Sequence, residues 1–341
     1  PVLNADRRLS GQTGCTPPSG NTESASLTEV LAIQRSGSVA QRPGDGKTQM
    51  KKHLRLDSFE LTLDDIASID VSMLHALSLG VGWPHRPEDW DMFRHVGQGF
   101  AAIDGIGRVF GTAMWFAHGA DFATIGMVIT SPRVQAQGNG RWLMDQVLER
   151  CGPRNLSLNA TRAAYNLFIS LGFVPEATVY QCQGEVALKA PNLGPANGEI
   201  KTISEADFDT VAALDTYAFG ADRTRLLHIL ARGSTAYGFW RDGALVGYAF
   251  RRRFGRGQVI GPIVASDDDD AIRLVSAHMT ELPGQFARVD TRQKEGAFMA
   301  FLQERGLSIF DTVTTMSKGR PFLKAKSGEP LVFGLASHAL S

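Results

Sequence analysis

The chain has 341 residues, enough for about two domains of ~100–200 residues each. Its 35 basic and 35 acidic residues cancel, so no net charge draws the protein to nucleic acid or to an anionic membrane. No apolar run reaches the ~18 residues of a membrane span. The three cysteines, Cys15, Cys151 and Cys182, lie too far apart for a zinc site or a disulfide framework. We expect a cytoplasmic protein that binds no metal, nucleic acid or membrane.

Residues 1–49 differ in composition from the rest of the chain. They are rich in Gly, Ser, Thr, Pro and Gln and poor in large apolar residues, so they bury too little surface to offset the entropy of ordering. They also lack the continuous apolar core of a secretory signal. We expect a disordered N-terminal extension with a native start near Met50, and a natural flexible arm is the alternative.

Apolar residues recur at helix or strand spacing from His53 onward. A helix is expected first, over 61–80, and a proline-broken loop with a short helix follows over 81–99. A β-hairpin over 99–116 is expected to turn at 104–107. The remaining elements of this half are expected in the order strand 122–131, helix 141–150, strand 155–161, helix 162–172 and strand 178–188.

A linker rich in Pro, Gly and Asn at residues 189–198 separates these elements from a second series. The second series returns in a similar order: two helices, a hairpin, a strand, a helix, a strand, a helix and a last strand. Three glycines of the first half recur at nearly the same intervals, as the pairs Gly111 and Gly247, Gly126 and Gly261, and Gly172 and Gly306. The chain therefore contains a weak internal repeat on the scale of a domain.

Two glycines, Gly138 and Gly140, stand between the strand expected at 122–131 and the helix that follows it. A helix N-terminus attracts anions through its unpaired N–H groups, and glycine lets a phosphate approach the backbone. A dinucleotide fingerprint would need a third glycine where Leu143 stands and an acidic residue about twenty positions on, and a Walker loop would need Gly-Lys-Ser/Thr. Neither pattern is present, so the stretch predicts a pyrophosphate cradle of another kind.

The segment Pro132-x-x-Gln135-x-x-Gly138-x-Gly140 resembles the phosphate loop of the GNAT superfamily of N-acetyltransferases, which bind acetyl-CoA. Residues 163–173, AAYNLFISLGF, are similar to a later segment of the same family. The resemblance implies an α/β (α+β) fold of two GNAT-like domains, each a mixed, largely antiparallel central sheet flanked by helices. It assigns a catalytic domain to residues 50–188 and a degenerate second GNAT-like domain to residues 199–341, as in tandem members.

The same resemblance implies acetyl-CoA as co-substrate. In the family, pantetheine pairs with a free strand edge and the pyrophosphate meets the helix N-terminus. The residues expected to bind acetyl-CoA are Val128, Ile129, Thr130, Gln135, Gln137, Gly138, Asn139, Gly140, Arg141, Thr161 and Phe168. The second half has four acidic residues, Asp267–Asp270, where its loop would lie, so we expect no CoA binding there.

Catalytic groups are expected near the loop that would cover the acceptor site. His85 is the first candidate for a base, because its ordinary pKa suits proton transfer near neutral pH, although a surface histidine is the simpler reading. Its neighbours Trp83, Glu88 and Trp90 are expected, with His85, to contact the substrate, and buried loop anchors are the alternative for the two tryptophans.

The resemblance also implies a hydrogen-bond donor that stabilises the oxyanion and a proton donor for the leaving thiolate. The N–H of Val128 falls where the family stabilises the oxyanion. Phe168 stands where many members have a tyrosine that protonates the leaving thiolate, and Tyr165 is the candidate substitute. A thiol pKa near ~8.5 makes thiolate a tolerable leaving group without a proton donor.

The resemblance predicts acetyl transfer to the primary amine of a small molecule by direct attack in a ternary complex. Two alternatives stay open: a non-catalytic acetyl-CoA-binding or regulatory protein, favoured by Phe168, and acetylation of a protein amine. The second half is expected to complete the substrate cleft or to mediate dimerisation. The C-terminal segment 330–341 is expected to dock on its own domain or on a partner subunit, which leaves a homodimer open. The basic run Arg251–Arg256 would contact an anion or lie solvated on a hairpin.

Overall fold

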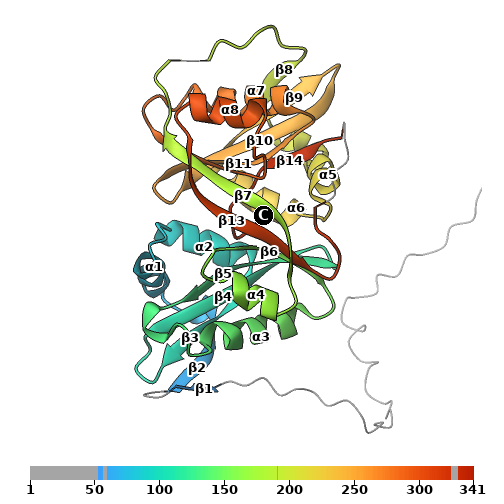
Figure 1. The fold of residues 1–341 in the computed structure, drawn as a ribbon. Coiled ribbons are helices and arrows are strands. Elements are labelled where there is room, and N and C mark those ends of the chain that lie inside the picture. The colour runs from blue at the N-terminus through green and yellow to red at the C-terminus, as the bar shows by residue number, and fades with distance from the viewer. Residues whose placement is uncertain (1–52, 57–59, 190, 324–328) are drawn as a thin grey trace, which may run out of the picture. The chain divides into compact units, whose positions relative to one another are not determined.

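The structure, a computed structural model, describes residues 53–56, 60–189, 191–323 and 329–341. Residues Met50–Ser341 form one compact unit (Figure 1). The extension expected at residues 1–49 lies outside the described residues.

The first half of this unit runs from β1 to β7. Its helices are α1 (Val71–Gly80), α2 (Pro87–Val96), α3 (Asn139–Cys151) and α4 (Tyr165–Ser170). Its strands are β1 (His53–Arg55), β2 (Glu60–Asp65), β3 (Gln98–Asp104), β4 (Val109–His118), β5 (Phe122–Thr130), β6 (Asn155–Ala160) and β7 (Val174–Glu185).

The helix expected over 61–80 is wrong in its first part. Residues 60–65 form β2, which pairs with β3, and α1 begins only at Val71. Asp70 sets that start, because its carboxylate accepts a hydrogen bond of 2.7 Å from the N–H of Ser72 and so caps the helix.

The second half repeats the order of elements. Its helices are α5 (Phe208–Phe219), α6 (Thr224–Ala231), α7 (Asp268–Met279) and α8 (Ala297–Glu304). Its strands are β8 (Glu199–Thr202), β9 (Ser234–Arg241), β10 (Ala244–Phe254), β11 (Gly257–Ala265), β12 (Phe286–Thr291), β13 (Ser308–Lys318) and β14 (Leu331–Gly334). The expected mixed and largely antiparallel arrangement is confirmed: of the described strand pairs, β5 with β6 and β11 with β12 are parallel.

The two halves share one continuous sheet, which the sequence did not predict. The described strands follow the order β1-β2-β3-β4-β5-β6-β13-β7-β12-β11-β10-β9-β8, and β14 pairs with β11 off this path. Strand β13 of the second half lies between β6 and β7, while β7 of the first half pairs with β12. The long strands β7 and β13 run side by side between the halves (Figure 1). Each half therefore completes the sheet of the other.

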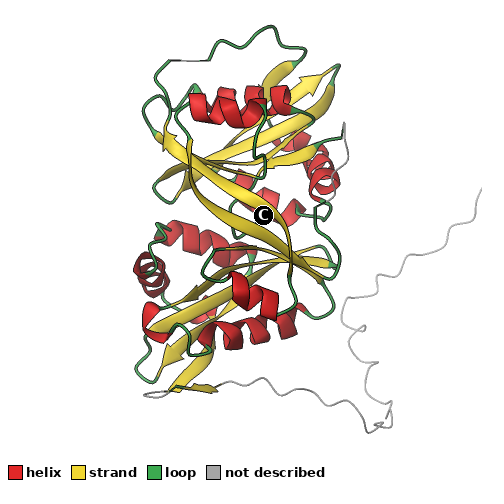
Figure 2. Ribbon diagram, in the orientation of Figure 1, coloured by secondary structure: helices red, strands yellow, loops and turns green. Residues whose placement is uncertain are grey.

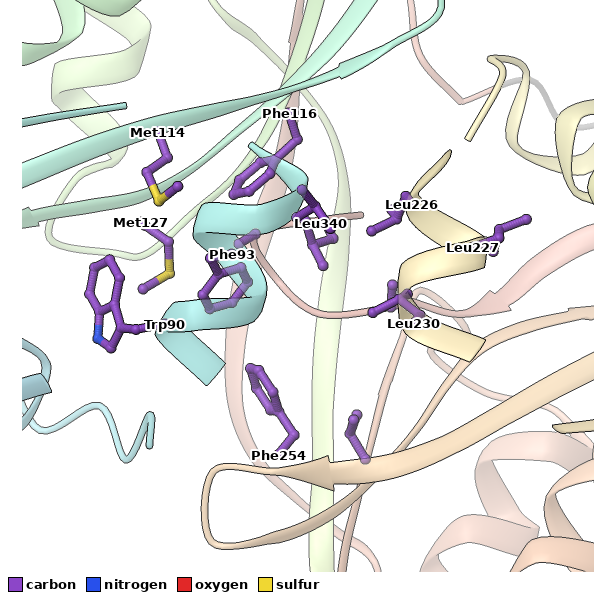
Figure 3. Close-up of a cluster of buried hydrophobic side chains, with 14 of the residues drawn as sticks. Trp90, Phe93, Met114, Phe116, Met127, Leu226, Leu227, Leu230, Phe254 and Leu340 are labelled. Atoms are coloured by element: carbon purple, nitrogen blue, oxygen red, sulfur yellow. The ribbon is translucent and has the colours of Figure 1, made fainter. Parts of the chain in front are cut away.

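Helices cover both faces of this sheet (Figure 2). Side chains of α3 and α4 form one hydrophobic cluster with the strands of the first half, and side chains of α7 and α8 form another with those of the second half. A third cluster contains residues of α1 and α2 together with residues of α5 and α6. Phe93, Met127, Leu230, Phe254 and Leu340 belong to it (Figure 3). Because this core draws on both halves, neither half has a complete core by itself.

Candidate active site

Strands β5 and β6 separate part-way along their length. They pair in parallel from Phe122 to Ile125, and no pairing with β6 is recorded for the rest of β5 within the described residues. Beside β4, Met127 and Val128 together face Ala113, which makes a β-bulge, and Met127 has a positive φ of 51°. The residues expected to bind pantetheine, Val128–Thr130, thus lie on a strand edge that is open on the β6 side.

Helix α3 begins directly beyond this edge. Gly138 is its N-cap residue, with φ +88°, and a Cβ there would meet no atom within 4 Å. A Cβ on Gly140 would lie 3.2 Å from Oγ1 of Thr130, so this glycine lets the helix approach β5 closely. The described residues provide no side-chain cap for α3, and its first N–H groups have no partner inside the helix. The glycine stretch therefore forms an open helix N-terminus beside a free strand edge.

The polar side chains of this stretch are partly engaged. Gln135 donates from Nε2 to the carbonyl of Thr130 at 3.1 Å, and Arg141 donates from Nη1 to Oγ of Ser170 at 3.0 Å. Asn139 is fully buried, and its Nδ2 donates to the carbonyl of Phe110 at 3.3 Å. The side chain of Asn139 thus ties α3 to β4, and of this residue only the backbone N–H is placed to bind an anion.

A cavity of about 330 Å³ opens beside the bulge of β5. Residues expected at the site that line it are Trp83, His85, Val128, Thr161 and Phe168. The second half supplies further lining residues that were not expected at the site, among them Phe254, Arg288, Asp311 and His338. Arg256, from the basic hairpin run, lines the cavity as well. The two halves thus build one cavity together.

His85 sits inside a ring of aromatic side chains. Its imidazole makes edge contacts with Trp83, Trp90, Phe93 and Phe254, at centroid distances between 5.6 and 6.4 Å. Its Nδ1 lies 3.4 Å from Oγ of Ser78. Burial lowers the pKa of His85 to about 4, so the ring is neutral at pH 7.

Three of the residues expected for catalysis or substrate contact do not line this cavity. Trp90 is fully buried and donates from Nε1 to Oγ of Ser78 at 2.8 Å, so it anchors α2 to α1 instead of forming a substrate wall. Glu88 is exposed in the first turn of α2. Tyr165 packs against the cluster under α3 and α4, because it leaves its helix at a different angle from Phe168. Phe168, which is buried, brings no hydroxyl to the site.

A buried ion pair lies at the wall of the cavity. Arg288 donates from Nε and Nη2 to the two carboxylate oxygens of Asp290, at 2.8 and 2.7 Å. Burial by itself would raise the pKa of Asp290, but Arg288 and His338 hold it well below its usual range. Arg288 and Asp290 alternate on β12 and so share a face, a pattern that could have been found in the sequence.

The corresponding place in the second half is closed. Strand β11 pairs with β12 only at Gln258 and Val259, and then β14 pairs with β11 from Ile263 to Ala265. Asp267 caps α7 by accepting a hydrogen bond of 2.9 Å from the N–H of Asp270. The C-terminal segment therefore docks on its own chain. Docking on its own domain was one of the two expectations, and docking on a partner subunit was the other.

No helix in the described ranges is long and apolar enough to span a membrane. The same residues contain no cluster of three or more His, Cys, Asp or Glu side chains suited to a metal.

Comparison with known proteins agrees with this geometry. The Acetyltransferase (GNAT) family matches residues 72–173, and the Acetyltransferase (GNAT) domain matches residues 211–329. The chain is a tandem GNAT protein. The first match contains the glycine stretch and the free edge of β5, and the second contains the strand edge that β14 covers.

Relatives of this tandem GNAT protein include the uncharacterized N-acetyltransferase YitH of Bacillus subtilis (strain 168). The two are 27% identical over 212 residues, which are 60% of this chain and 73% of YitH. A proposed acetyltransferase of Pyrococcus horikoshii has a similar fold, with a TM-score of 0.68 and 16% identity over 86% of this chain and 100% of that one. A tandem GNAT protein from the clavulanic acid biosynthesis pathway has a TM-score of 0.53 and 17% identity over 75% of this chain and 98% of that one. At these identities the structural likeness concerns the fold.

Proposed function

We propose that the protein is an acetyl-CoA-dependent N-acetyltransferase that acts on the primary amine of a small molecule. Residues 50–188 are its CoA-binding half, and residues 199–341, joined through the linker 189–198, complete the acceptor site without binding CoA. The observation that carries the proposal is the open edge of β5 leading into the N-terminus of α3, which has no side-chain cap. Membership of the GNAT family supports the acetyl transfer itself.

Backbone groups would do most of the binding. The edge Val128–Thr130 would hold pantetheine, and the N–H groups of Gln137 to Arg141 would hold the pyrophosphate, with Gly138 leaving room for it. Thr161 and Phe168 line the cavity where the pantetheine arm would end. Acetyl-CoA supplies the acetyl group as a thioester.

The acceptor amine would attack within the cavity while both substrates are bound. The N–H of Val128 would stabilise the oxyanion, because the bulge places this residue at the cavity wall. The volume of about 330 Å³ and the lining from both halves favour a small molecule over a protein amine. Phe168 supplies no proton, so the thiolate would leave unprotonated or take its proton from water.

Thermal unfolding with acetyl-CoA, CoA and NAD tests the binding half of the proposal. A ligand that binds only the folded state raises the midpoint, and ligand at 100 times Kd adds about 2.7 kcal/mol. We expect acetyl-CoA and CoA to raise the midpoint of the wild type, and NAD to leave it unchanged.

The matched variants Gly138→Asn and Gly138→Asp separate charge from backbone strain. Both residues tolerate positive φ and are nearly equal in size, but Asp places a carboxylate where the pyrophosphate would lie. We expect the shift with acetyl-CoA to shrink for Gly138→Asn and to vanish for Gly138→Asp. No shift for the wild type at millimolar acetyl-CoA would contradict the proposal.

Phe168 supports a second candidate, a non-catalytic protein that binds acetyl-CoA. Thiol release from acetyl-CoA in the presence of primary amines separates the two candidates. Release above the rate without protein supports the enzyme, whereas a thermal shift with acetyl-CoA and no release supports the binding protein.

A further inference from the structure

The C-terminal segment 335–341 crosses both halves of the protein. A Cβ on Gly261 of β11 would lie 2.0 Å from the carbonyl oxygen of Leu335, and a Cβ on Gly126 of β5 would lie 2.6 Å from Cβ of Ala339. The segment thus runs from one glycine of the internal repeat to its counterpart in the other half. His338 is the only residue of 333–341 that is not buried, with 24% of its side chain exposed, and it lines the cavity.

Hydrogen bonds hold the backbone of this segment on several sides. The N–H of Leu335 donates to the carbonyl of Asp290 at 2.8 Å, and Nη2 of Arg252 donates to the carbonyl of Ala336 at 2.5 Å. Nδ2 of Asn159, on β6, donates to the carbonyl of His338 itself at 2.8 Å. The imidazole therefore stands on a fixed backbone. The next residue, Ala339, contacts Gly126, which precedes the bulge that bears Val128.

Asp290 lies beside this imidazole. Nε2 of His338 is buried and makes no hydrogen bond within the described residues, but it lies 3.4 Å from Oδ1 of Asp290, whose carboxylate is fixed by Arg288. Once this distance shortens, a proton on Nε2 would be donated to the carboxylate and the lone pair of Nδ1 would remain for a substrate. Such distances are often long before substrates bind. His85 differs, because its nearest polar contact is Oγ of Ser78 and not a carboxylate.

We propose that His338, oriented by Asp290, is the base that takes a proton from the acceptor amine; this inference rests on the proposed function. An alkyl amine enters mostly as ammonium, since its pKa is about 10.4. His338 accepts one proton, the freed lone pair forms the bond to the acetyl carbon, and the bond from that carbon to sulfur breaks. The second proton of the nitrogen passes to water, the thiolate leaves unprotonated or takes a proton from water, and the proton on His338 returns to water.

Several charged or titratable groups line the cavity around His338 or, like Arg252, hold its segment, so the pH dependence of activity does not report on His338 alone. They come from the loop before α2, from β10 and its turn, from β12 and from β13: His85, Arg252, Arg256, Arg288, Asp290 and Asp311. A pH profile must therefore be compared between variants and not interpreted from one curve.

Thiol release from acetyl-CoA, with glycinamide, Nα-acetyl-lysine, spermidine and glucosamine as acceptors, tests the proposal in the full-length protein. We expect His338→Ala to lower kcat/KM by about 10²–10⁴-fold at pH 7, the usual contribution of a general base. Its thermal shift with acetyl-CoA should remain. Added imidazole should restore part of the rate, and the loss should shrink as the pH rises toward the amine pKa. The control His53→Ala, on the distant strand β1, should keep full activity.

The outcomes are distinguishable. A His338→Ala protein with nearly wild-type rates would overturn the role of His338 and leave the proposed function standing. A loss that imidazole and high pH do not relieve, or that is accompanied by loss of the acetyl-CoA shift, would show a structural role and also overturn it. Absence of thiol release from the wild type with every amine would overturn the proposed function together with this inference.

Discussion

The edge of β5 beyond Ile125 is free, whereas the corresponding edge of β11 is paired with β14. Both strands pair in parallel with the next strand only over their first residues, and both lead into a helix. The helix of the first half begins at a glycine with no side-chain cap, and that of the second half begins at Asp267, which caps it. The same architecture thus carries an open site in one half and a closed one in the other.

The difference shows how a repeated fold distributes its tasks. The second half keeps the layers and supplies the strand β13, cavity residues and the C-terminal segment, but local changes remove its cradle. Covering a strand edge satisfies its backbone groups, so the closed half gains stability from the same surface that the open half leaves for a ligand.

Separating the two halves of the protein should have the largest effect on the stability of the fold. A fragment that ends at residue 198 lacks β13, so β6 and β7 lose the strand that lies between them, and the core shared by α1, α2, α5 and α6 is incomplete. We expect no cooperative thermal unfolding by circular dichroism. A fragment of residues 50–198 that unfolds cooperatively and responds to acetyl-CoA would contradict the dependence of one half on the other.

The glycine pair Gly126 and Gly261 tests the path of the C-terminal segment. A Cβ at either position would overlap the segment, so Gly126→Ala and Gly261→Ala should each destabilise the protein by about 1–3 kcal/mol, the usual cost of overpacking. Gly261→Ala should cost more, because its Cβ meets a backbone carbonyl at 2.0 Å. Urea unfolding measures both, with Gly105→Ala in an open turn as the control. Equal stability of all three variants would show that the segment runs elsewhere.

Each half also contains a buried histidine whose protonation opposes folding. Burial lowers the pKa of His118 to about 3 and that of His278 to about 4. Both values lie below the unfolded pKa of about 6.5, so the unfolded chain binds the proton first. This stability is fully present above pH 6.5 and declines as the pH falls toward 4. Urea unfolding between pH 7 and pH 4.5 should show a smaller decline for His118→Gln than for the wild type or His53→Gln. An equal decline in all three proteins would contradict this role of His118.

Introducing a hydroxyl at position 168 should have the smallest effect, a modest change in kcat. Phe168→Tyr places a phenol at the cavity wall, but thiolate leaves without assistance at an acceptable rate, so the gain in kcat should stay below the ~10²-fold of an essential acid. Steady-state thiol release measures it, with Tyr165→Phe as the companion variant. A gain of that full size would mean that the wild type lacks its proton donor.

Local patterns predicted the backbone roles of the two glycines at the start of α3. Gly138 adopts the positive φ that favours glycine, and Gly140 allows the close approach of α3 to β5, both of which follow from residues adjacent in sequence. The free edge after Ile125 was implied by the family resemblance alone, and the bulge at Met127 was not predicted.

Long-range features were not predictable in this way. The strand exchange pairs Ala160 with Thr314, and the cavity joins Val128 to His338; no periodicity reports contacts over such separations. Trp90 was expected at the substrate because aromatic residues in a loop suit either a wall or an anchor, and only the buried hydrogen bond to Ser78 decides between them. The spacing of Arg288 and Asp290 is visible in the sequence, but it does not differ from that of an ordinary charged pair on the exposed face of a strand.

The stoichiometry of acetyl-CoA binding, measured by isothermal titration calorimetry on the full-length protein, tests the contrast between the halves most directly. One molecule per chain, lost in Gly138→Asp, is the predicted result, because the edge of β5 is free and that of β11 is covered. Two molecules per chain, or one that survives Gly138→Asp, would contradict the assignment of an open first half and a closed second half.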